Sequence, residues 1–390
     1  MEYRKIGDTG MAASVVGLGT EHLDFKPYAL VEETVHAAVE RGINILDLFM
    51  PGDEVRTNVG RALAGRREKV LIQGHIGSVD SNGQYDVSRD VEVCKRYFES
   101  LLRCLGTDYI DFGMLLFMDS QEAFDEVFGG GVIEYARHLK RSGTIRAIGA
   151  SSHNPEIALK VVETGLVDLL MFSVNPAFDL MPAGTGVLDA LGDPAEPEKA
   201  PLFSSLMREN VDPKRAELYR RCESLGVAIT VMKTLGAGKL LSPDHTPFAR
   251  PLTVGQCVHY ALTRPAVVSA LVGCKGEAEV REAARYLEMS DAERDYAEAI
   301  GSFQGSFRGS CVYCNHCQPC PSGIDIGAVG KYLDIAALDA DNVPPGVAAH
   351  YRALAAHASD CVACGECERR CPFSVAVIDN MRRAASVFGY

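Results

Sequence analysis

Eight short apolar segments, each followed by an amphipathic one, constrain the fold of this chain more than any other feature. They are rich in β-branched residues and have no polar face, which is typical of parallel strands buried on both sides. Eight such strand–helix units close into a barrel, so we predict an α/β protein built on a (β/α)8 TIM barrel. An open, doubly wound sheet is the alternative, but no GxGxxG motif follows the first strand. The predicted strands are residues 15–19, 44–47, 70–75, 109–116, 147–151, 169–174, 228–232 and 269–274.

Turn and cap residues mark the ends of these elements. The turn Asp8-Thr9-Gly10 predicts a short β-hairpin before the first barrel strand. Asn154-Pro155 and Asp212-Pro213 each place a capping side chain before a proline, as at the start of a helix. Residues 178–211 are a long connection after the sixth strand. Since loops of this length often cover an active site, we predict a lid there.

Eight of the 13 cysteines lie in two runs near the C-terminal end of the sequence. Three cysteines spaced by two residues wrap one cubane cluster, and a fourth before a proline reaches the other cluster in two-cluster ferredoxins. The first run has two residues before its last cysteine instead of three, so the cluster bound by that cysteine stays open. Zinc in Cys₄ sites is the alternative to iron–sulfur. We assign Cys311, Cys314, Cys317 and Cys371 to one [4Fe–4S] cluster, and Cys361, Cys364, Cys367 and Cys320 to the other.

The distribution of these features predicts two domains, a barrel at residues 1–300 and a small α-rich ferredoxin-like domain at 301–390. A net charge of −13 without a basic stripe argues against a nucleic-acid partner. No signal peptide and no apolar run of about 18 residues is found, so we expect no membrane association. Clustered cysteines in such a chain indicate metal ligands in a reducing compartment, hence a cytoplasmic enzyme of anaerobic or low-oxygen chemistry.

The active site of a TIM barrel forms at the C-terminal ends of its strands. His75 is the first candidate for a proton donor, since imidazole titrates near neutrality, and Asp47 on the adjacent strand would orient it. The alternative is that His75 only fills space. His22 and His153 are further candidates, and a metal site made of His22, His75 and Asp47 is a second alternative.

Other strand ends predict a binding site for a cofactor or substrate. Gly19 ends the first strand, and Asn175 follows the sixth. Lys233, with Leu235 and Gly236 in a glycine-rich stretch, is suited to hold a phosphate group.

Several stretches resemble the aldo-keto reductases, in the branch that carries a C-terminal ferredoxin domain. The resemblance implies a TIM barrel and hydride transfer from a nicotinamide to a carbonyl, assisted by an Asp, Tyr, Lys and His. The matching stretches are MEYRKIGDTGMAASVVGLGT at the start, GINILD at 42–47, DYIDFGMLL at 108–116, IGASSHNPE at 148–156, VMKTLGAGKL at 231–240, CNHCQPCPSGIDI at 314–326 and CVACGECERRCP at 361–372.

The residues that the resemblance implies are mostly replaced. Asp47 matches the family's aspartate, whereas His75 stands at the lysine position and Leu116 at the histidine position. The tyrosine expected about five residues after Asp47 is absent. The catalytic tetrad is therefore degenerate in this chain.

The implied cofactor pocket is also altered. Ser151 and Glu282 match family positions, but Met171 stands at the position of the glutamine that helps hold the carboxamide. Met232 replaces the aromatic residue that stacks on the nicotinamide, and Ala283 replaces an asparagine. Glu279, at the site of the 2′-phosphate, repels phosphate. NAD(P) in the family's usual mode is thus disfavoured, and a flavin stays open.

Three functions remain. The first is an oxidoreductase in which [4Fe–4S] clusters exchange electrons with a small molecule at the barrel mouth, served by an electron-transfer protein partner. The second is an NAD(P)H-dependent carbonyl reductase with a variant acid group. The third is a non-catalytic electron-transfer or docking protein.

Overall fold

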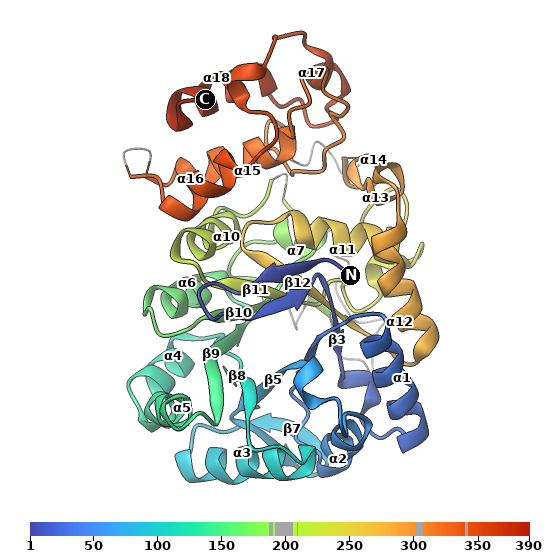
Figure 1. The fold of residues 1–390 in the computed structure, drawn as a ribbon, viewed down its shortest axis with the longest axis vertical. Coiled ribbons are helices and arrows are strands. Elements are labelled where there is room, and N and C mark those ends of the chain that lie inside the picture. Colours follow the sequence, from blue (N-terminus) through green and yellow to red (C-terminus); the bar gives the residue numbers. More distant parts are fainter. Residues whose placement is uncertain (187–189, 192–205, 209, 302–306, 340–341) are drawn as a thin grey trace. The chain divides into compact units, whose positions relative to one another are not determined.

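A computed structural model describes residues 1–186, 190–191, 206–208, 210–301, 307–339 and 342–390 (Figure 1). By internal contacts the chain divides into two compact units. One comprises Met1–Val174, Val227–Thr234 and Val268–Glu288, and the other Asn175–Gly226, Leu235–Val267 and Met289–Tyr390. The predicted boundary near residue 300 stays a prediction, and most of the predicted lid lies outside the described residues.

Eight parallel strands form a closed barrel, as predicted from the sequence. In order around the barrel they are β3 (Val16–Gly19), β4 (Ile45–Leu48), β5 (Leu71–Ile76), β8 (Ile110–Leu115), β9 (Ile145–Ser152), β10 (Leu169–Ser173), β11 (Ala228–Met232) and β12 (Val267–Gly273). The register pairs Gly19 with both Asp47 and Gly273, so the carboxyl ends of these strands lie at one edge. The alternative of an open sheet is wrong.

The first unit holds helices between the strands of the barrel. They are η1 (Glu21–Leu23), α1 (Tyr28–Glu40), α2 (Asp53–Ala62), η2 (Arg67–Lys69), α3 (Val91–Leu105), α4 (Gln121–Phe128), α5 (Gly131–Ser142), α6 (Pro155–Glu163), α12 (Glu277–Ala284) and η5 (Arg285–Glu288). The predicted cap at Asn154 is confirmed, because its side chain accepts hydrogen bonds from the backbone N–H groups of Glu156 and Ile157.

The second unit is mostly helical. Its helices are α7 (Pro176–Asp179), α10 (Pro213–Leu225), η4 (Lys239–Leu241), α11 (Val254–Thr263), α13 (Asp291–Arg294), α14 (Ala297–Gly301), α15 (Ile326–Ala336), α16 (Pro345–Arg352), η6 (Ala358–Asp360), α17 (Glu366–Arg370) and α18 (Val377–Phe388). The cap predicted at Asp212 is confirmed at the start of α10. Among the described residues, no helix has the length and apolarity needed to cross a membrane.

The predicted N-terminal hairpin is present and fills one end of the barrel. It pairs β1 (Tyr3–Lys5) with β2 (Ala12–Ser14). Its apolar side chains Ile6 and Met11 belong to the same buried cluster as Ile45 and Leu71, the inward-facing residues at the amino ends of β4 and β5. This end is therefore packed with apolar side chains, and polar groups inside the barrel gather at its other end.

A second hairpin, which the sequence analysis did not predict, follows β5. It pairs β6 (Ser78–Ser81) with β7 (Gln84–Val87). The turn passes through Asn82 and Gly83, both with positive φ, as tight hairpin turns require. Because the hairpin leaves the carboxyl end of a barrel strand, it brings Tyr85 toward the mouth.

Candidate functional site

Asp47 and His75, the first catalytic candidates, are in direct contact at the barrel mouth. The Nε2 atom of His75 lies 2.8 Å from Oδ1 of Asp47, and both residues are 3% exposed. Gln73, which faces the same side of β5, donates a second hydrogen bond to this oxygen at 2.9 Å. The sequence analysis missed Gln73, although its place two residues before His75 on a strand puts it on the same face.

The other ring nitrogen of His75 has no protein partner. Its Nδ1 atom is buried, and no hydrogen bond reaches it in the part of the chain that the structure describes. Since Asp47 is an acceptor, the Nε2 atom carries a proton, and Nδ1 is left to accept or donate one at the mouth. This geometry suits proton transfer better than the alternative that His75 only fills space.

Aromatic rings lie beside this histidine. The rings of Phe49 and His75 are 6.1 Å apart and meet edge to face. Tyr85 from the β6–β7 hairpin contacts Phe49 at 5.2 Å, and Phe117 lies 6.2 Å from Tyr85. Burial, followed by the charge of Glu21, raises the pKa of the Tyr85 phenol. These rings limit the access of water to the Asp47–His75 pair.

His153 forms a second histidine–carboxylate pair. Its Nδ1 atom lies 2.9 Å from Oδ2 of Asp119, and its backbone N–H donates to Oδ1 at 2.6 Å. Burial alone would raise the pKa of the Asp119 carboxyl, but hydrogen bonds from His153 and Ser152 hold it below its ordinary value. Asp119 follows β8 in an irregular segment and was not predicted.

His22 does not join these pairs. It is exposed in η1 and lies against Gly273, where a β-carbon would come within 3.0 Å of its Cδ2 atom. Among the described residues, no three histidine, cysteine or acidic side chains form a group that could hold one metal ion. The alternative of a metal site made of His22, His75 and Asp47 is therefore wrong for the described chain.

The predicted cofactor residues in the first unit lie at strand ends. Ser151 is fully buried in β9, where its Oγ accepts a hydrogen bond from the backbone N–H of Phe117. Gly19 ends β3, and Lys233 follows β11 with a φ of 59°. All three are at the carboxyl edge, but the Ser151 hydroxyl serves the protein's own backbone.

The predicted residues of the second unit are in turns. The buried Asn175 caps α7 by accepting hydrogen bonds from the N–H groups of Ala177 and Phe178. Leu235 accepts a hydrogen bond from the N–H of Gly238, and Gly236 begins three consecutive residues with positive φ. This backbone forms a tight turn, as the glycine-rich stretch requires.

The region predicted to meet an adenosine phosphate is acidic. Glu279 on α12 accepts a hydrogen bond from the backbone N–H of Lys275 at 2.8 Å. Glu282 is on the same helix and lies 3.9 Å from Arg285, and Glu277 pairs with Arg281. Carboxylates thus occupy the start of the helix, where a phosphate would otherwise be favoured.

The eight clustered cysteines line two cavities. One is lined by Cys311, Cys314, Cys317 and Cys371. The other is lined by Cys320, Cys361, Cys364, Cys367 and also Cys317. The division of cysteines between the cavities matches the assignment made from their spacing, with Cys317 bordering both.

The loops that carry these cysteines repeat one backbone conformation. Tyr313 and Asn315 on either side of Cys314 have φ of 58°. Ala363 and Gly365 on either side of Cys364 have φ of 53° and 78°. The two runs are also followed by helices at the same spacing. α15 begins six residues after the last cysteine of the first run, and α18 begins six residues after the last cysteine of the second. Left-handed residues around the middle cysteine turn the loop around its cavity.

The cysteines of the first run are half-buried. Burial raises the pKa of Cys314 to about 11 and that of Cys317 to about 12. A metal must displace these protons on binding. In a Cys₄ zinc site four thiolates bind the same ion, whereas in a cubane each thiolate binds a different iron.

His316 lies within the first run and contacts a carboxylate. Its Nδ1 atom forms an ion pair with Asp295. We therefore assign it a place beside the cavity and no ligand role.

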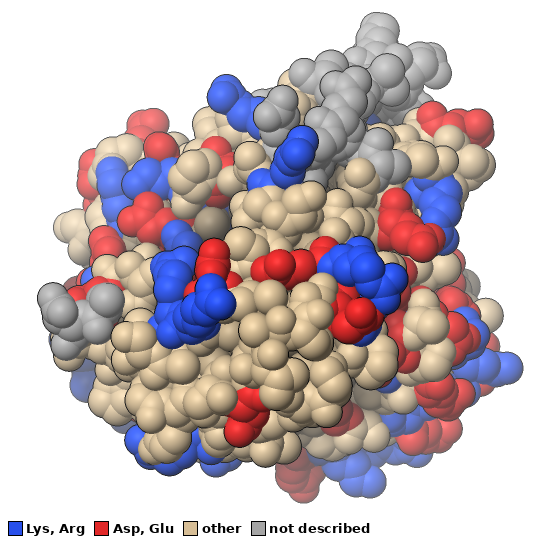
Figure 2. Space-filling model, turned by 90° about the horizontal axis from the view of Figure 1, so that it is seen from above, with Lys and Arg blue, Asp and Glu red and all other residues tan. Residues whose placement is uncertain are grey.

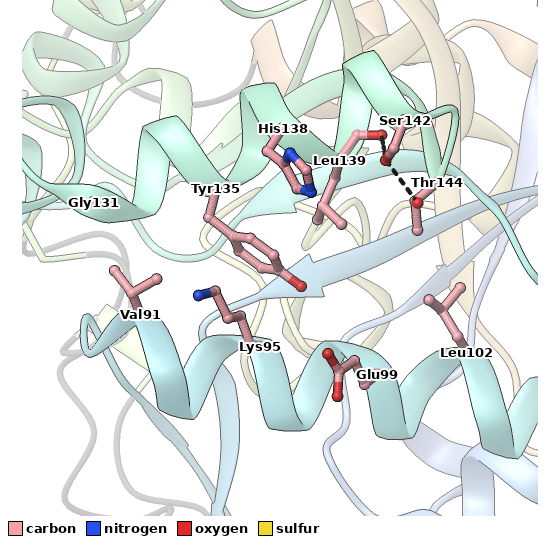
Figure 3. A pocket seen from close by; sticks show the side chains of 10 residues that line it. All are labelled: Val91, Lys95, Glu99, Leu102, Gly131, Tyr135, His138, Leu139, Ser142 and Thr144. Carbon is pink, nitrogen blue, oxygen red and sulfur yellow. Dashed lines mark hydrogen bonds between the residues drawn. The ribbon is translucent and has the colours of Figure 1, made fainter.

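A larger open groove lies on the outside of the barrel (Figure 3). It runs between α3 and α5, with Lys95 and Glu99 on one helix and Tyr135 and His138 on the other. None of its residues comes from the carboxyl end of a strand. We assign no chemistry to this groove.

The fold and the strand-end site define an α/β-barrel protein with a buried acid–histidine pair. Residues 15–179 match the model of the Aldo/keto reductase family. The aldo-keto reductase YhdN of Bacillus subtilis is 30% identical over 192 residues, which are 46% of this chain and 54% of that protein. The chain thus spans about half the length of this curated relative.

Solved structures show the same fold. The holo form of aldo-keto reductase AKR11C1 from Bacillus halodurans matches with a TM-score of 0.58 and 22% identity, over 77% of this chain and 96% of that one. A putative aldo-keto reductase from Pseudomonas aeruginosa matches with a TM-score of 0.53 and 22% identity, over 73% and 95%.

Proposed function

We propose that this protein is an oxidoreductase of the aldo-keto reductase type in which two [4Fe–4S] clusters exchange electrons with a small molecule at the barrel mouth. The family match and the curated relative support the oxidoreductase class. The observation that carries the electron-transfer part is the arrangement of eight cysteines around two cavities in two loops of the same conformation.

The donor sets fit the proposed groups. The first cavity presents four thiols, the number that a cubane requires, and the second presents four besides that of Cys317, which borders both. Cys311, Cys314, Cys317 and Cys371 would hold one cluster, and Cys361, Cys364, Cys367 and Cys320 the other. When bound, such clusters supply electrons one at a time. Their total of two equals the electrons of one hydride.

The barrel residues would handle the proton. Asp47 and Gln73 fix the orientation of the His75 ring, and the Nδ1 atom of His75 is left for the substrate. The contact between the buried Asp47 and His75 side chains holds the ring in one orientation. His75 is thus suited to deliver a proton to a carbonyl oxygen that receives electrons.

A second function, NAD(P)H-dependent carbonyl reduction with His75 as the acid, is favoured by the family match. The acidic start of α12 disfavours it for NADPH. Bound or titratable NAD(P) in the purified protein would favour this second function, since only the first can proceed without a hydride donor.

The test is the iron content of protein purified without air. We expect about eight irons and eight sulfides per chain, the content of two cubanes. Cys311→Ser and Cys361→Ser should each lose about four irons, since they belong to different cavities. The control is Cys104→Ser, near the end of α3 and in contact with Ser100. This variant should keep all the irons. Zinc in place of iron would overturn the proposal.

A further inference from the structure

Arg264 is a buried cation behind the first cysteine loop. It follows α11 and is 4% exposed. Its guanidinium donates a hydrogen bond to the carbonyl oxygen of Val312. The hydroxyl of Tyr296 donates to the same oxygen at 2.8 Å. Since Val312 directly follows Cys311, the charge of Arg264 is held against the loop that lines the first cavity.

The direct contacts of this cation are with neutral groups. It lies 4.4 Å from the ring centroid of Tyr260 and 4.9 Å from that of Tyr313. The hydroxyls of these tyrosines donate, each at 2.7 Å, to the carboxylates of Asp179 and Asp334. Tyr260 and Tyr313 thus each contact both Arg264 and a carboxylate.

The surroundings keep the guanidinium charged. Burial by itself lowers the pKa of Arg264, but Tyr260, Tyr296, Asp179 and Tyr313 together raise it above its ordinary value. Buried charges act through a low dielectric and are little screened by salt. The field of Arg264 at the first cavity is consequently stronger than that of an exposed arginine.

Among the residues that the structure describes, no buried arginine donates to the backbone of the second cysteine loop at the equivalent place. In the repeat, Ala363 stands where Tyr313 stands in the first loop, so no ring is present for an arginine to pack on. In the second loop Glu366 pairs with the exposed Arg369 and with Arg370. Arg370 is 25% exposed and donates hydrogen bonds to the carbonyl oxygens of Cys317 and Pro319, between the two cavities, so its charge does not favour the second cavity alone. The two cavities therefore differ in the charge behind them.

We propose that Arg264 raises the reduction potential of the cluster held by Cys311, Cys314, Cys317 and Cys371 above that of the other cluster. Reduction adds one negative charge to a cluster, which a nearby fixed positive charge stabilises, and net charge is a known determinant of cluster potentials. Electrons from a low-potential one-electron carrier settle first on the Arg264 side. This inference rests on the proposed function, since it needs both clusters.

The test is a dithionite titration followed by electron paramagnetic resonance, after the iron of each variant is counted. In Arg264→Gln the equilibrium constant for reducing one cluster should fall about tenfold, or about 59 mV for one electron. The other cluster, an internal control, should not change. Arg264→Lys keeps the charge and should shift the potential less.

Asp334→Asn gives an independent measurement of opposite sign. This variant keeps a side chain of the same shape beside Tyr313 but removes a negative charge, so the first cluster should become easier to reduce. If Arg264→Gln loses iron, the potential of the first cluster in Asp334→Asn tests the inference instead. The inference would be overturned if the reduction potentials of both clusters shifted equally, or if neither shifted while eight irons were present. Either result would leave the proposed function intact. A wild-type protein without iron would overturn both.

Discussion

At the scale of single residues, the barrel mouth depends on one carboxylate oxygen that accepts two hydrogen bonds. Oδ1 of Asp47 accepts a hydrogen bond from the Gln73 side chain and contacts Nε2 of His75. All three side chains are buried. The choice of Asp47 and His75 from the sequence is consistent with this geometry, because residues at the ends of adjacent parallel strands lie side by side. Gln73 was missed because its type alone suggests no chemistry.

Removal of the proton-handling side chain should abolish most turnover. We expect His75→Gln to lower the rate by about 10²–10⁴-fold, the usual contribution of a general acid or base. The measurement is the initial rate with the fastest carbonyl substrate of a panel. The matched control His138→Gln, in the outer groove between α3 and α5, should keep the wild-type rate. Equal rates for wild type and His75→Gln would assign His75 a packing role.

Asp119 should make folding stability depend on acid pH. Burial raises the pKa of its carboxyl, but the hydrogen bonds from His153 and Ser152 outweigh this and depress it. A depressed carboxyl pKa stabilises the fold above the unfolded value of about 3.9, and this stabilisation is lost as the pH falls through the folded pKa.

Asp119→Asn should therefore be less stable than the wild type at pH 7, and the difference should shrink below about pH 4. Urea unfolding at several pH values measures it. A difference that stays constant from pH 7 down to acid would show that the charge of Asp119 is not what stabilises the segment.

At the scale of elements, the helices of the barrel pack closely where glycine permits it. A β-carbon at Gly60 on α2 would come within 2.6 Å of the Cα atom of Leu105 and 2.7 Å of the carbonyl oxygen of Cys104. Both are backbone atoms at the end of α3. Backbone atoms cannot move away from a new β-carbon as the end of a flexible side chain can. Gly60 thus sets the closest approach of α2 and α3.

Gly60→Ala should destabilise the barrel by about 1–3 kcal/mol, as overpacking does. The measurement is the free energy of unfolding in urea, followed by circular dichroism. Gly346→Ala on α16 is the control, because a β-carbon there meets no atom within 4 Å. It should leave stability unchanged or raise it by less than about 1 kcal/mol, since alanine favours helix. Equal effects at both positions would contradict the packing argument.

The sequence predicted helices and strands close to their observed positions where a capping residue or an apolar periodicity marks them. Asn154 and Asp212 cap helices as expected, and the eight strands lie within a few residues of the predicted ranges. The β6–β7 hairpin was missed, because its residues are mostly exposed and show no apolar alternation. It contributes Tyr85 to the mouth, so its omission also hid part of the candidate site.

At the scale of the whole molecule, the distribution of charge affects how the protein behaves in solution. Figure 2 shows one face, on which basic and acidic side chains are interspersed among broad uncharged areas. The net charge is −13. Such a surface favours solubility and mutual repulsion over binding to polyanions.

Removal of iron should loosen the cysteine region and leave the barrel folded. Without metal, the cysteine loops lose the bonds from their thiolates to the proposed clusters, whereas the barrel has its own buried apolar cluster. Hydrogen exchange measured by mass spectrometry should show protection lost in 307–339 and 342–390 after chelation, and retained in β3 to β5. Loss of protection throughout the chain would show that the barrel depends on the metal. Unchanged exchange would show that the loops fold without it.

The sequence alone determined the barrel and the grouping of the cysteines, because strand periodicity and cysteine spacing are local patterns that impose their geometry wherever they occur. Only the tertiary structure decided which polar side chains meet. Asp119 with His153, Gln73 with Asp47, and Arg264 with the Val312 carbonyl are contacts between segments far apart in the chain. Such contacts depend on the closure of the barrel and the packing of helices, which no local pattern encodes.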